Sequence, residues 1–269
     1  MFKALAKVIA DNFINSKRTW GMALIDLKKR YSSSALGWFW AIVKPALFVI
    51  VYWFGIQIGI RGGASAENGV PFILWLLAGI LPWFFVSDTL VVCGTSIRSN
   101  RHLVTKSVFS AATIPTFVET SFFVTHLLLL AIATVIFALC GFITIGFVQI
   151  LYGLVCLYLL MWVVSLFFSA LVAVSRDFEY MLKSATQVLF WLSPILWNVD
   201  KIAKYPLIHF IVRLNPIGYV ISVYRNAFLG GWFWNDLTGT VCFWVEIVVL
   251  ALVGAYVFKK LEREFADIL

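Results

Sequence analysis

The sequence predicts an all-α membrane protein with six transmembrane helices. Of the 269 residues, 62% are hydrophobic and 13% are charged, whereas soluble domains are typically about 45–50% apolar and about 25% charged. The apolar residues also gather in runs close to the ~20 residues that a helix needs to cross a bilayer. The chain shows no nucleic-acid-binding motif, so its net charge of +8 indicates orientation and contact with anionic lipids.

The first segment, Phe2–Asn15, predicts an amphipathic helix that lies on the membrane surface. Its residues Phe2, Leu5, Ile9 and Phe13 fall on one helical face, and lysines occupy the polar side. Charged residues interrupt the apolar stretch, which argues against a signal peptide. A basic segment follows and leads into the first apolar run.

Six apolar runs are predicted to span the membrane. The fifth is short and is broken at Ser193-Pro194. In the first, Pro45 loosens the helix because a proline has no backbone N–H to donate. The runs are Leu36–Ile60, Pro71–Val92, Ala111–Cys140, Gly146–Val174, Ser184–Val199 and Leu237–Phe258.

Between the fifth and sixth runs lies an apolar stretch that prolines interrupt, residues 200–231. Pro206, Pro216 and Gly218 leave no part of it long enough to cross a bilayer alone. Broken backbone at membrane depth is tolerated where protein buries it or where it lines water. We therefore expect a re-entrant pair of short helices, with an amphipathic pair lying on the surface as the alternative.

One membrane domain, residues 1–269, accounts for the whole chain. With the N-terminus inside the cell, most of the 21 lysines and arginines fall in cytoplasmic segments, so the charge bias places both termini in the cytoplasm. The domain divides into a cytoplasmic interface helix and basic segment (1–33), a membrane bundle (36–258) and a cytoplasmic tail (259–269).

Several kinds of chemistry have no motif in the sequence. The chain contains no GxxxxGK[ST] phosphate loop and no HExxH zinc motif, so neither ATP hydrolysis by this chain alone nor metal catalysis is expected. Charged residues do occur in or near the apolar runs, at Lys44, Asp88, Glu119 and Glu246, of which Glu246 lies deepest in its run. Such residues are functional candidates in lipid, or they form hydrogen bonds between helices.

The order of several short motifs resembles the ABC-2 type permeases that export lipid-linked polysaccharides. The motifs are DLKKRYSSSALGWFW near the start, then SPI, and then NP followed by YR. Within that family, FGIQIGIRGG, WLLAGILPWFF and YVISVYRNAF look most like the wall teichoic acid exporters, and O-antigen and capsule exporters share the scaffold. The matching residues are Asp26, Leu27, Lys28, Arg30, Tyr31, Ser34, Leu36, Gly37, Trp40, Ser193, Pro194, Ile195, Asn215, Pro216, Tyr224 and Arg225.

The resemblance implies the ABC-2 exporter fold, which is type V-like, and a set of partners. It implies a homodimer in a bacterial cytoplasmic membrane, joined by two copies of a separate ATPase subunit that uses ATP and Mg. This chain would be a permease rather than an enzyme and would bind no cofactor itself. The substrate would be a polymer on undecaprenyl diphosphate, with wall teichoic acid favoured and O-antigen or capsular polysaccharide as the alternative.

The basic cluster before the first span is the candidate site for capturing the lipid diphosphate. Lys28, Lys29 and Arg30 stand at the headgroup level beside Tyr31, where arginine offers a planar fork and lysine a compact charge to phosphate oxygens. The same cluster also serves as an anchor under the positive-inside rule.

Aromatic residues on the first and fifth runs suit a polymer path, because sugar faces pack on rings without a fixed hydrogen-bond pattern. Interfacial aromatic belts explain the same residues. The path candidates are Trp38, Trp40, Tyr52, Trp53, Phe190, Trp191 and Trp197. The residues expected to couple to the ATPase are Arg98, Asn100, Arg101, His102 and Lys106, in a loop that is otherwise an ordinary connection. The outer-gate candidates are Arg213, Asn215, Pro216, Tyr224 and Arg225.

Three other functions remain open at the level of sequence. An ATP-independent secondary carrier would need a relay of ionisable groups, and the few present lie on different runs. An integral membrane transferase would need a convergent set of acidic residues, which the chain does not show. An ABC-2 drug or haem exporter shares the scaffold but fits the KKRY segment and the short first outer loop less well.

Overall fold

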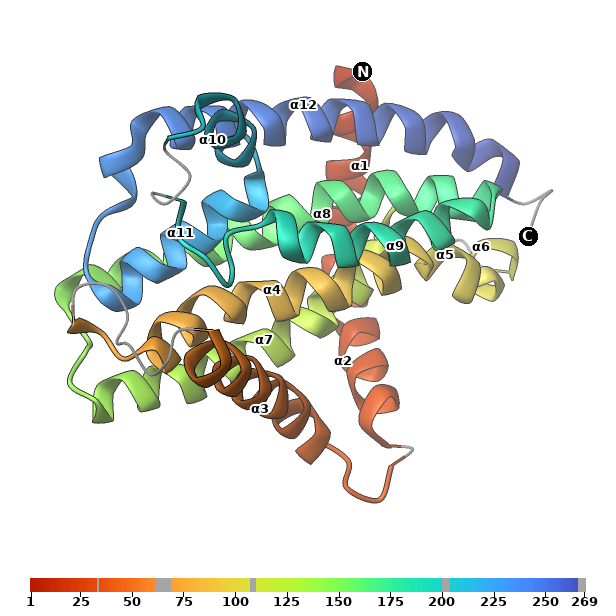
Figure 1. Cartoon of the computed structure of the whole chain (residues 1–269). Coiled ribbons are helices and arrows are strands. Elements are labelled where there is room, and N and C mark those ends of the chain that lie inside the picture. Colours follow the sequence, from red (N-terminus) through yellow and green to blue (C-terminus); the bar gives the residue numbers. More distant parts are fainter. Residues whose placement is uncertain (33, 61–68, 107–109, 200–203, 266–269) are drawn as a thin grey trace.

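The computed structural model describes residues 1–32, 34–60, 69–106, 110–199 and 204–265. Within these ranges the chain folds into helices joined by short turns, with no strand (Figure 1). This confirms the predicted all-α class. The helices are α1 (Phe2–Ile14), α2 (Ser16–Ser32), α3 (Phe39–Trp53), η1 (Phe54–Ile60), α4 (Phe72–Gly94), α5 (Ser96–Ser99), α6 (Arg101–Lys106), α7 (Thr113–Leu139), η3 (Ile145–Gln149), α8 (Ile150–Val174), α9 (Asp177–Leu192), α10 (Pro206–Arg213), α11 (Pro216–Leu229), η5 (Phe233–Asp236), α12 (Leu237–Leu261) and η6 (Glu262–Glu264).

Five helical segments are long and apolar enough to cross a bilayer. Each matches a predicted run, and the boundaries differ by a few residues, which is the usual error at helix ends. This confirms the first four predicted spans and the sixth. The segments are Phe39–Gly59, Phe72–Gly94, Thr113–Leu139, Ile145–Val174 and Phe233–Glu264.

The predicted boundaries of the fifth span were wrong. The helix there, α9, runs from Asp177 to Leu192 instead of Ser184–Val199 and has 16 residues, fewer than the ~20 that a span needs. It starts early because Asp177 and Glu179 occupy its first turn, where negative charge favours a helix. It ends early because Ser193 is extended, at φ −82° and ψ 142°, as a residue before proline prefers.

The pair of short helices predicted before the last span is present as α10 and α11. The two helices meet at 80° across a break at residues 214–215. The side chain of Asn215 caps α11 by accepting from the amide of Ile217 (3.0 Å) and donates to Ser193 Oγ (2.9 Å). Most of α11 is buried against α4 and α8, so the alternative of a pair lying wholly on the surface does not hold. Only α10 is largely exposed.

Two helices at the N-terminus run across the long helices instead of along them (Figure 1). The amphipathic helix predicted from residue 2 is α1, which confirms that expectation. The basic segment that follows also forms a helix, α2, which the sequence analysis did not predict. Its buried residues Thr19, Ala23 and Leu27 recur every four residues, and α2 packs against α7.

The core of the bundle is centred on α4, which packs against α3, α7, α8, α9 and α11. On the far side of α8 lies α12. An ion pair joins the two ends of the chain, since Lys259 Nζ lies 3.0 Å from Asp11 Oδ2. In contrast, α3 stands at the edge of the bundle and packs mainly against α4 (Figure 1), which leaves space on its flanks.

Candidate functional site

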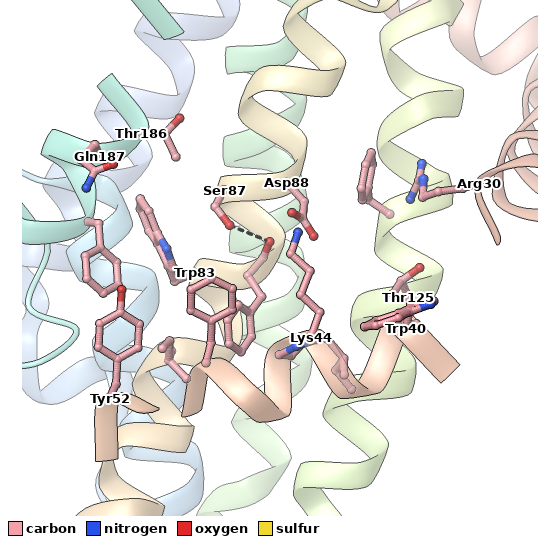
Figure 2. A pocket seen from close by; sticks show the side chains of 18 of the residues that line it. Arg30, Trp40, Lys44, Tyr52, Trp83, Ser87, Asp88, Thr125, Thr186 and Gln187 are labelled. Atoms are coloured by element: carbon pink, nitrogen blue, oxygen red, sulfur yellow. Dashed lines mark hydrogen bonds between the residues drawn. The ribbon is translucent and has the colours of Figure 1, made fainter. Parts of the chain in front are cut away.

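A cavity of about 460 Å³ lies between α3, α4, α7 and α9, beside the end of α2 (Figure 2). Its size falls within the ~300–1,000 Å³ typical of ligand pockets. Charged and aromatic side chains dominate its wall. The lining residues are Arg30, Tyr31, Trp40, Ala41, Lys44, Pro45, Phe48, Tyr52, Ile80, Trp83, Phe84, Ser87, Asp88, Phe122, Thr125, Leu129, Lys183, Thr186, Gln187 and Phe190.

The charges in this wall are mostly positive. Three cations, Arg30, Lys44 and Lys183, face one carboxylate, Asp88. In Figure 2 the Lys44 ammonium points toward Asp88, and both Lys44 and Arg30 act electrostatically on that carboxylate. Asp26 and Glu179 lie outside the lining and pair with Arg30 and Lys183, so the wall itself carries more cations than anions and an anionic ligand would compete with these carboxylates.

Arg30 is held in place by groups outside the cavity. Its Nη2 donates to Asp26 Oδ2 (2.7 Å) and to Ser121 Oγ on α7 (2.6 Å). The guanidinium lies over the ring of Phe122, 3.3 Å from its centroid, a cation–π arrangement. Its Nη1 has no hydrogen-bond partner in the part of the chain that the structure describes, so the guanidinium keeps an unused donor.

Lys183 enters the cavity from α9 and has a partner on its own helix. Its Nζ donates to Glu179 Oε1 at 2.6 Å, one turn away. This hydrogen bond lowers the pKa of the Glu179 carboxyl. Glu179 is N-terminal to the predicted fifth span, Ser184–Val199. Both side chains remain accessible, so a ligand anion can compete with Glu179 for the ammonium.

Aromatic rings form a continuous strip across the cavity. The Tyr52 ring of α3 lies 5.2 Å from that of Phe190 on α9, and Phe190 lies 5.5 Å from Trp83 on α4. Phe48 continues the strip one turn earlier, 6.1 Å from Tyr52. Ring faces of this kind bind apolar C–H surfaces, and the Tyr52 hydroxyl and the Trp83 indole N–H can also form hydrogen bonds.

The structure brings part of the predicted capture cluster to the cavity. Arg30 and Tyr31 line it, whereas Lys28 and Lys29 are exposed on the last turn of α2 and do not. The Tyr31 ring stacks on Trp38, with centroids 4.9 Å apart. The cluster is therefore divided between an inner pair and an outer pair.

The predicted path aromatics also divide. Trp40, Tyr52 and Phe190 line the cavity. Trp53 packs against the core, and Trp191 is exposed. The indole of Trp197 donates to the backbone oxygen of Trp191 at 3.2 Å, and neither residue lines the cavity. Trp38 also lies outside the lining.

The predicted outer-gate residues mostly serve as contacts between helices. Arg225 donates from Nη1 and Nη2 to the carbonyl oxygens of Pro194 (2.6 Å) and Ile195 (2.5 Å), and its guanidinium lies 3.5 Å from the centroid of Trp75. The hydroxyl of Tyr224 lies 2.8 Å from Nε2 of the buried His126.

The remaining members of this group lie around α10 and the break before α11. Arg213 forms an exposed ion pair with Asp236 (2.7 Å), Asn215 caps α11, and Pro216 is its first residue. Residues 200–203, at the start of the predicted re-entrant segment 200–231, lie outside the described residues.

The predicted coupling residues lie on α5 and α6, at the end of the bundle where α12 finishes (Figure 1). Arg101 and His102 are exposed, and Arg98 is half-buried. Asn100 Nδ2 donates to the Ser96 oxygen at 2.9 Å. The side chain of Lys106 lies outside the described residues.

Burial of the charges inside the spans differs from the sequence-based expectation. Glu246 lies deepest in its run but is half-exposed in the structure, whereas Glu119 is fully buried on α7. Both carboxylate oxygens of Glu119 lack a hydrogen-bond partner among the described residues. Depth along one helix does not report which face the other helices cover.

Sequence reasoning noticed Lys44 and Asp88 but did not connect them, and it missed Trp83, Phe122 and Lys183. A usable signal existed for α3, where Trp40, Lys44, Phe48 and Tyr52 recur every four residues, the spacing of one helical face. No such signal joins α3 to α4 or α9.

Comparison with known proteins agrees with this architecture. The O-antigen export system permease protein RfbA of Klebsiella pneumoniae is 26% identical over 256 residues, which cover 91% of this chain and 92% of that protein. The protein of the same name from Myxococcus xanthus is 25% identical over 251 residues, which cover 90% of this chain and 91% of that protein. The family model for ABC-2 type transporters matches residues 18–229, which include every helix that lines the cavity. The chain therefore belongs to the ABC-2 type transporter family.

Proposed function

We propose that this chain is the membrane-spanning subunit of an ATP-driven transporter that exports a polymer linked to a lipid diphosphate. The cavity is the observation that carries the proposal. Its wall combines the cations Arg30, Lys44 and Lys183 with a strip of aromatic rings. Diphosphate oxygens match the cations, and the sugars or polyols next to the diphosphate match the rings.

Arg30 and Lys44 are the groups best placed to bind the diphosphate. Arg30 is already oriented by Asp26 and Ser121, so little side-chain freedom is lost when it binds. Lys44 points toward Asp88 and would exchange that carboxylate for phosphate when a ligand binds. Lys28 and Lys29, exposed at the end of α2, provide the outer approach.

The exported polymer is a polysaccharide of the cell envelope on an undecaprenyl diphosphate carrier. The names of the relatives support an O-antigen-type glycan. The stretches FGIQIGIRGG, WLLAGILPWFF and YVISVYRNAF favour wall teichoic acid instead. The cavity suits the lipid diphosphate that both substrates share, so the two polymers must be distinguished by experiment.

The proposed assembly is a homodimer of this chain with two copies of an ABC ATPase that uses ATP and Mg. It lies in the bacterial cytoplasmic membrane with both termini in the cytoplasm. α5 and α6 would face the ATPase, because Arg101 and His102 are exposed there and both helices lie at the end of the bundle that the charge bias assigns to the cytoplasm. The outer gate would be formed by the bent pair of α10 and α11.

The test is reconstitution of the chain with its partner ATPase in vesicles that contain a fluorescent lipid-linked glycan and, separately, a lipid-linked polyol phosphate. ATP is expected to move one of them to the opposite leaflet, and that one identifies the polymer. Lys44→Gln is expected to lower the rate about tenfold or more, because it removes a charge-assisted contact with phosphate. Lys260→Gln, which changes an exposed lysine outside the cavity, is the matched control.

Two results would contradict the proposal. Transport without ATP or without the ATPase would show a secondary carrier. A Lys44→Gln protein that transports both substrates at the normal rate would show that the cavity is not the binding site.

A further inference from the structure

A second cavity of about 360 Å³ lies on the other flank of α3. It is bounded by α3, α4 and α7, and its wall contains no charged side chain among the described residues. Its lining residues are Ile42, Pro45, Ala46, Val49, Ile50, Pro71, Ile73, Leu74, Leu77, Leu81, Phe84, Leu129, Ile132, Ala133, Ile136 and Cys140. Such a wall offers hydrocarbon contact and nothing for a polar ligand to bind.

The two cavities adjoin. Pro45, Phe84 and Leu129 line both of them, one residue each from α3, α4 and α7. At this shared boundary the wall changes from cationic and aromatic to uncharged and almost entirely aliphatic. A ligand that fills both spaces must therefore join an anionic head directly to a hydrocarbon chain.

The helix between the cavities has a different face for each. Residues of α3 that line the first cavity recur every four positions from Trp40 to Tyr52, and those that line the second lie between them, from Ile42 to Ile50. Pro45 stands where the two sets meet. Because it cannot donate to the carbonyl of Ala41, α3 is locally less constrained there.

We propose that the second cavity binds the part of the lipid carrier's hydrocarbon chain that is nearest to the diphosphate, while the first cavity holds the diphosphate. The identity of the head group rests on the proposed function. The continuity of the two walls and the absence of charge from the second one favour this occupant. The binding site thus recognises an amphipathic lipid as one unit, with the rest of the chain in the bilayer.

The test measures binding of defined probes to the full-length chain in nanodiscs by native mass spectrometry. The probes are geranylgeranyl diphosphate, which has a head and a tail, and inorganic diphosphate, which has the head alone. Ala46→Phe narrows the second cavity from a position that is exposed, so folding is not at risk. Leu47→Phe adds bulk at the next residue, which lines neither cavity, and is the matched control.

Ala46→Phe is expected to weaken binding of geranylgeranyl diphosphate about tenfold and to leave inorganic diphosphate unaffected, whereas Leu47→Phe changes neither. Lys44→Gln is expected to weaken both probes. If Lys44→Gln weakens both probes and Ala46→Phe weakens neither, the tail lies elsewhere and only this inference fails.

Two further outcomes would overturn the inference. If neither variant changes binding of either probe, the head site of the proposed function fails as well. If Ala46→Phe alters the oligomeric state but not lipid binding, the second cavity is an interface between copies of this chain.

Discussion

The first two spans, Phe39–Gly59 and Phe72–Gly94, are almost equally apolar but occupy opposite environments. In the most apolar 18-residue window of each span, 11% of the residues are buried in the first and 67% in the second. α4 packs against α3, α7, α8, α9 and α11, whereas α3 has a cavity on each flank. Hydropathy thus reports that a segment leaves water, but it does not distinguish a helix fixed by its neighbours from one that borders a ligand site.

The largest effect on stability is expected where α11 is anchored over α4. Arg225→Met leaves the carbonyl oxygens of Pro194 and Ile195 without donors and removes the guanidinium from Trp75. A hydrogen bond to a charged group contributes about 1.5–3 kcal/mol, so a loss of about 3 kcal/mol or more is expected for the two together. Thermal unfolding in detergent would measure it.

Arg213→Met is the matched control for that change. Arg213 and its partner Asp236 are both nearly half-exposed. An ion pair at such an exposed position contributes about 0–1 kcal/mol. Equal losses for the two arginines would contradict the view that α4 and α11 form a fixed core.

A glycine pair compares the two spans directly. A methyl group added at Gly79 of α4 would run into the guanidinium of Arg225, whereas one added at Gly55, just after α3, would meet no atom within 4 Å. Gly79→Ala is expected to cost about 1–3 kcal/mol, and Gly55→Ala to be neutral or slightly stabilising. The midpoint temperature of heat-induced aggregation measures the stability of each variant. Similar midpoints for the two variants would contradict the tighter packing around α4.

A smaller loss is expected from the buried pair that joins α7 to α11. Tyr224→Phe removes the hydroxyl 2.8 Å from His126 Nε2. His126 then lies buried with neither ring nitrogen partnered among the described residues, since its Nδ1 already lacks a partner there. The expected cost is about 1–2 kcal/mol. His126→Phe in the Tyr224→Phe background should recover part of it, and no recovery would mean that the pair is not coupled.

The smallest effect on stability, with a large effect on transport, is expected on α3. Trp40 lines the first cavity, and 45% of its surface is exposed. Its neighbour Trp38 is equally exposed, at 46%. Trp40→Ala should change stability by no more than about 0.5 kcal/mol and still slow transport in the vesicle assay. Trp38→Ala, outside the cavity lining, is the control, and parallel losses of stability and transport for Trp40→Ala would contradict the comparison.

The sequence was sufficient to predict the helices whose position depends on hydrophobicity. Five spans and the amphipathic first helix follow from apolar runs and helical spacing, and those expectations are confirmed. The sequence-based prediction of α9 was wrong, because a search for apolar runs leaves out the charged first turn at Asp177. It also missed α2, whose packed face has small residues such as Ala23 rather than a hydrophobic stripe.

The site was only partly predictable, for a geometric reason. Successive residues of a helix are rotated by about 100°, so Arg30 faces the cavity while the adjacent Lys28 and Lys29 do not. Arg225 pairs with backbone oxygens thirty residues away, and side-chain patterns carry no information about such partners. The cavity joins residues of five helices, whose packing the order of motifs does not determine.

The ion pair between Asp11 and Lys259 has a consequence for synthesis. Helix α1 leaves the ribosome well before α12, yet it packs against α12. At about 5–20 residues per second, α12 follows on the order of tens of seconds later. During that interval α1 can contact only α2 and α7, and the ion pair from Asp11 to Lys259 cannot form. The final position of α1 therefore depends on a helix that is made near the end of translation.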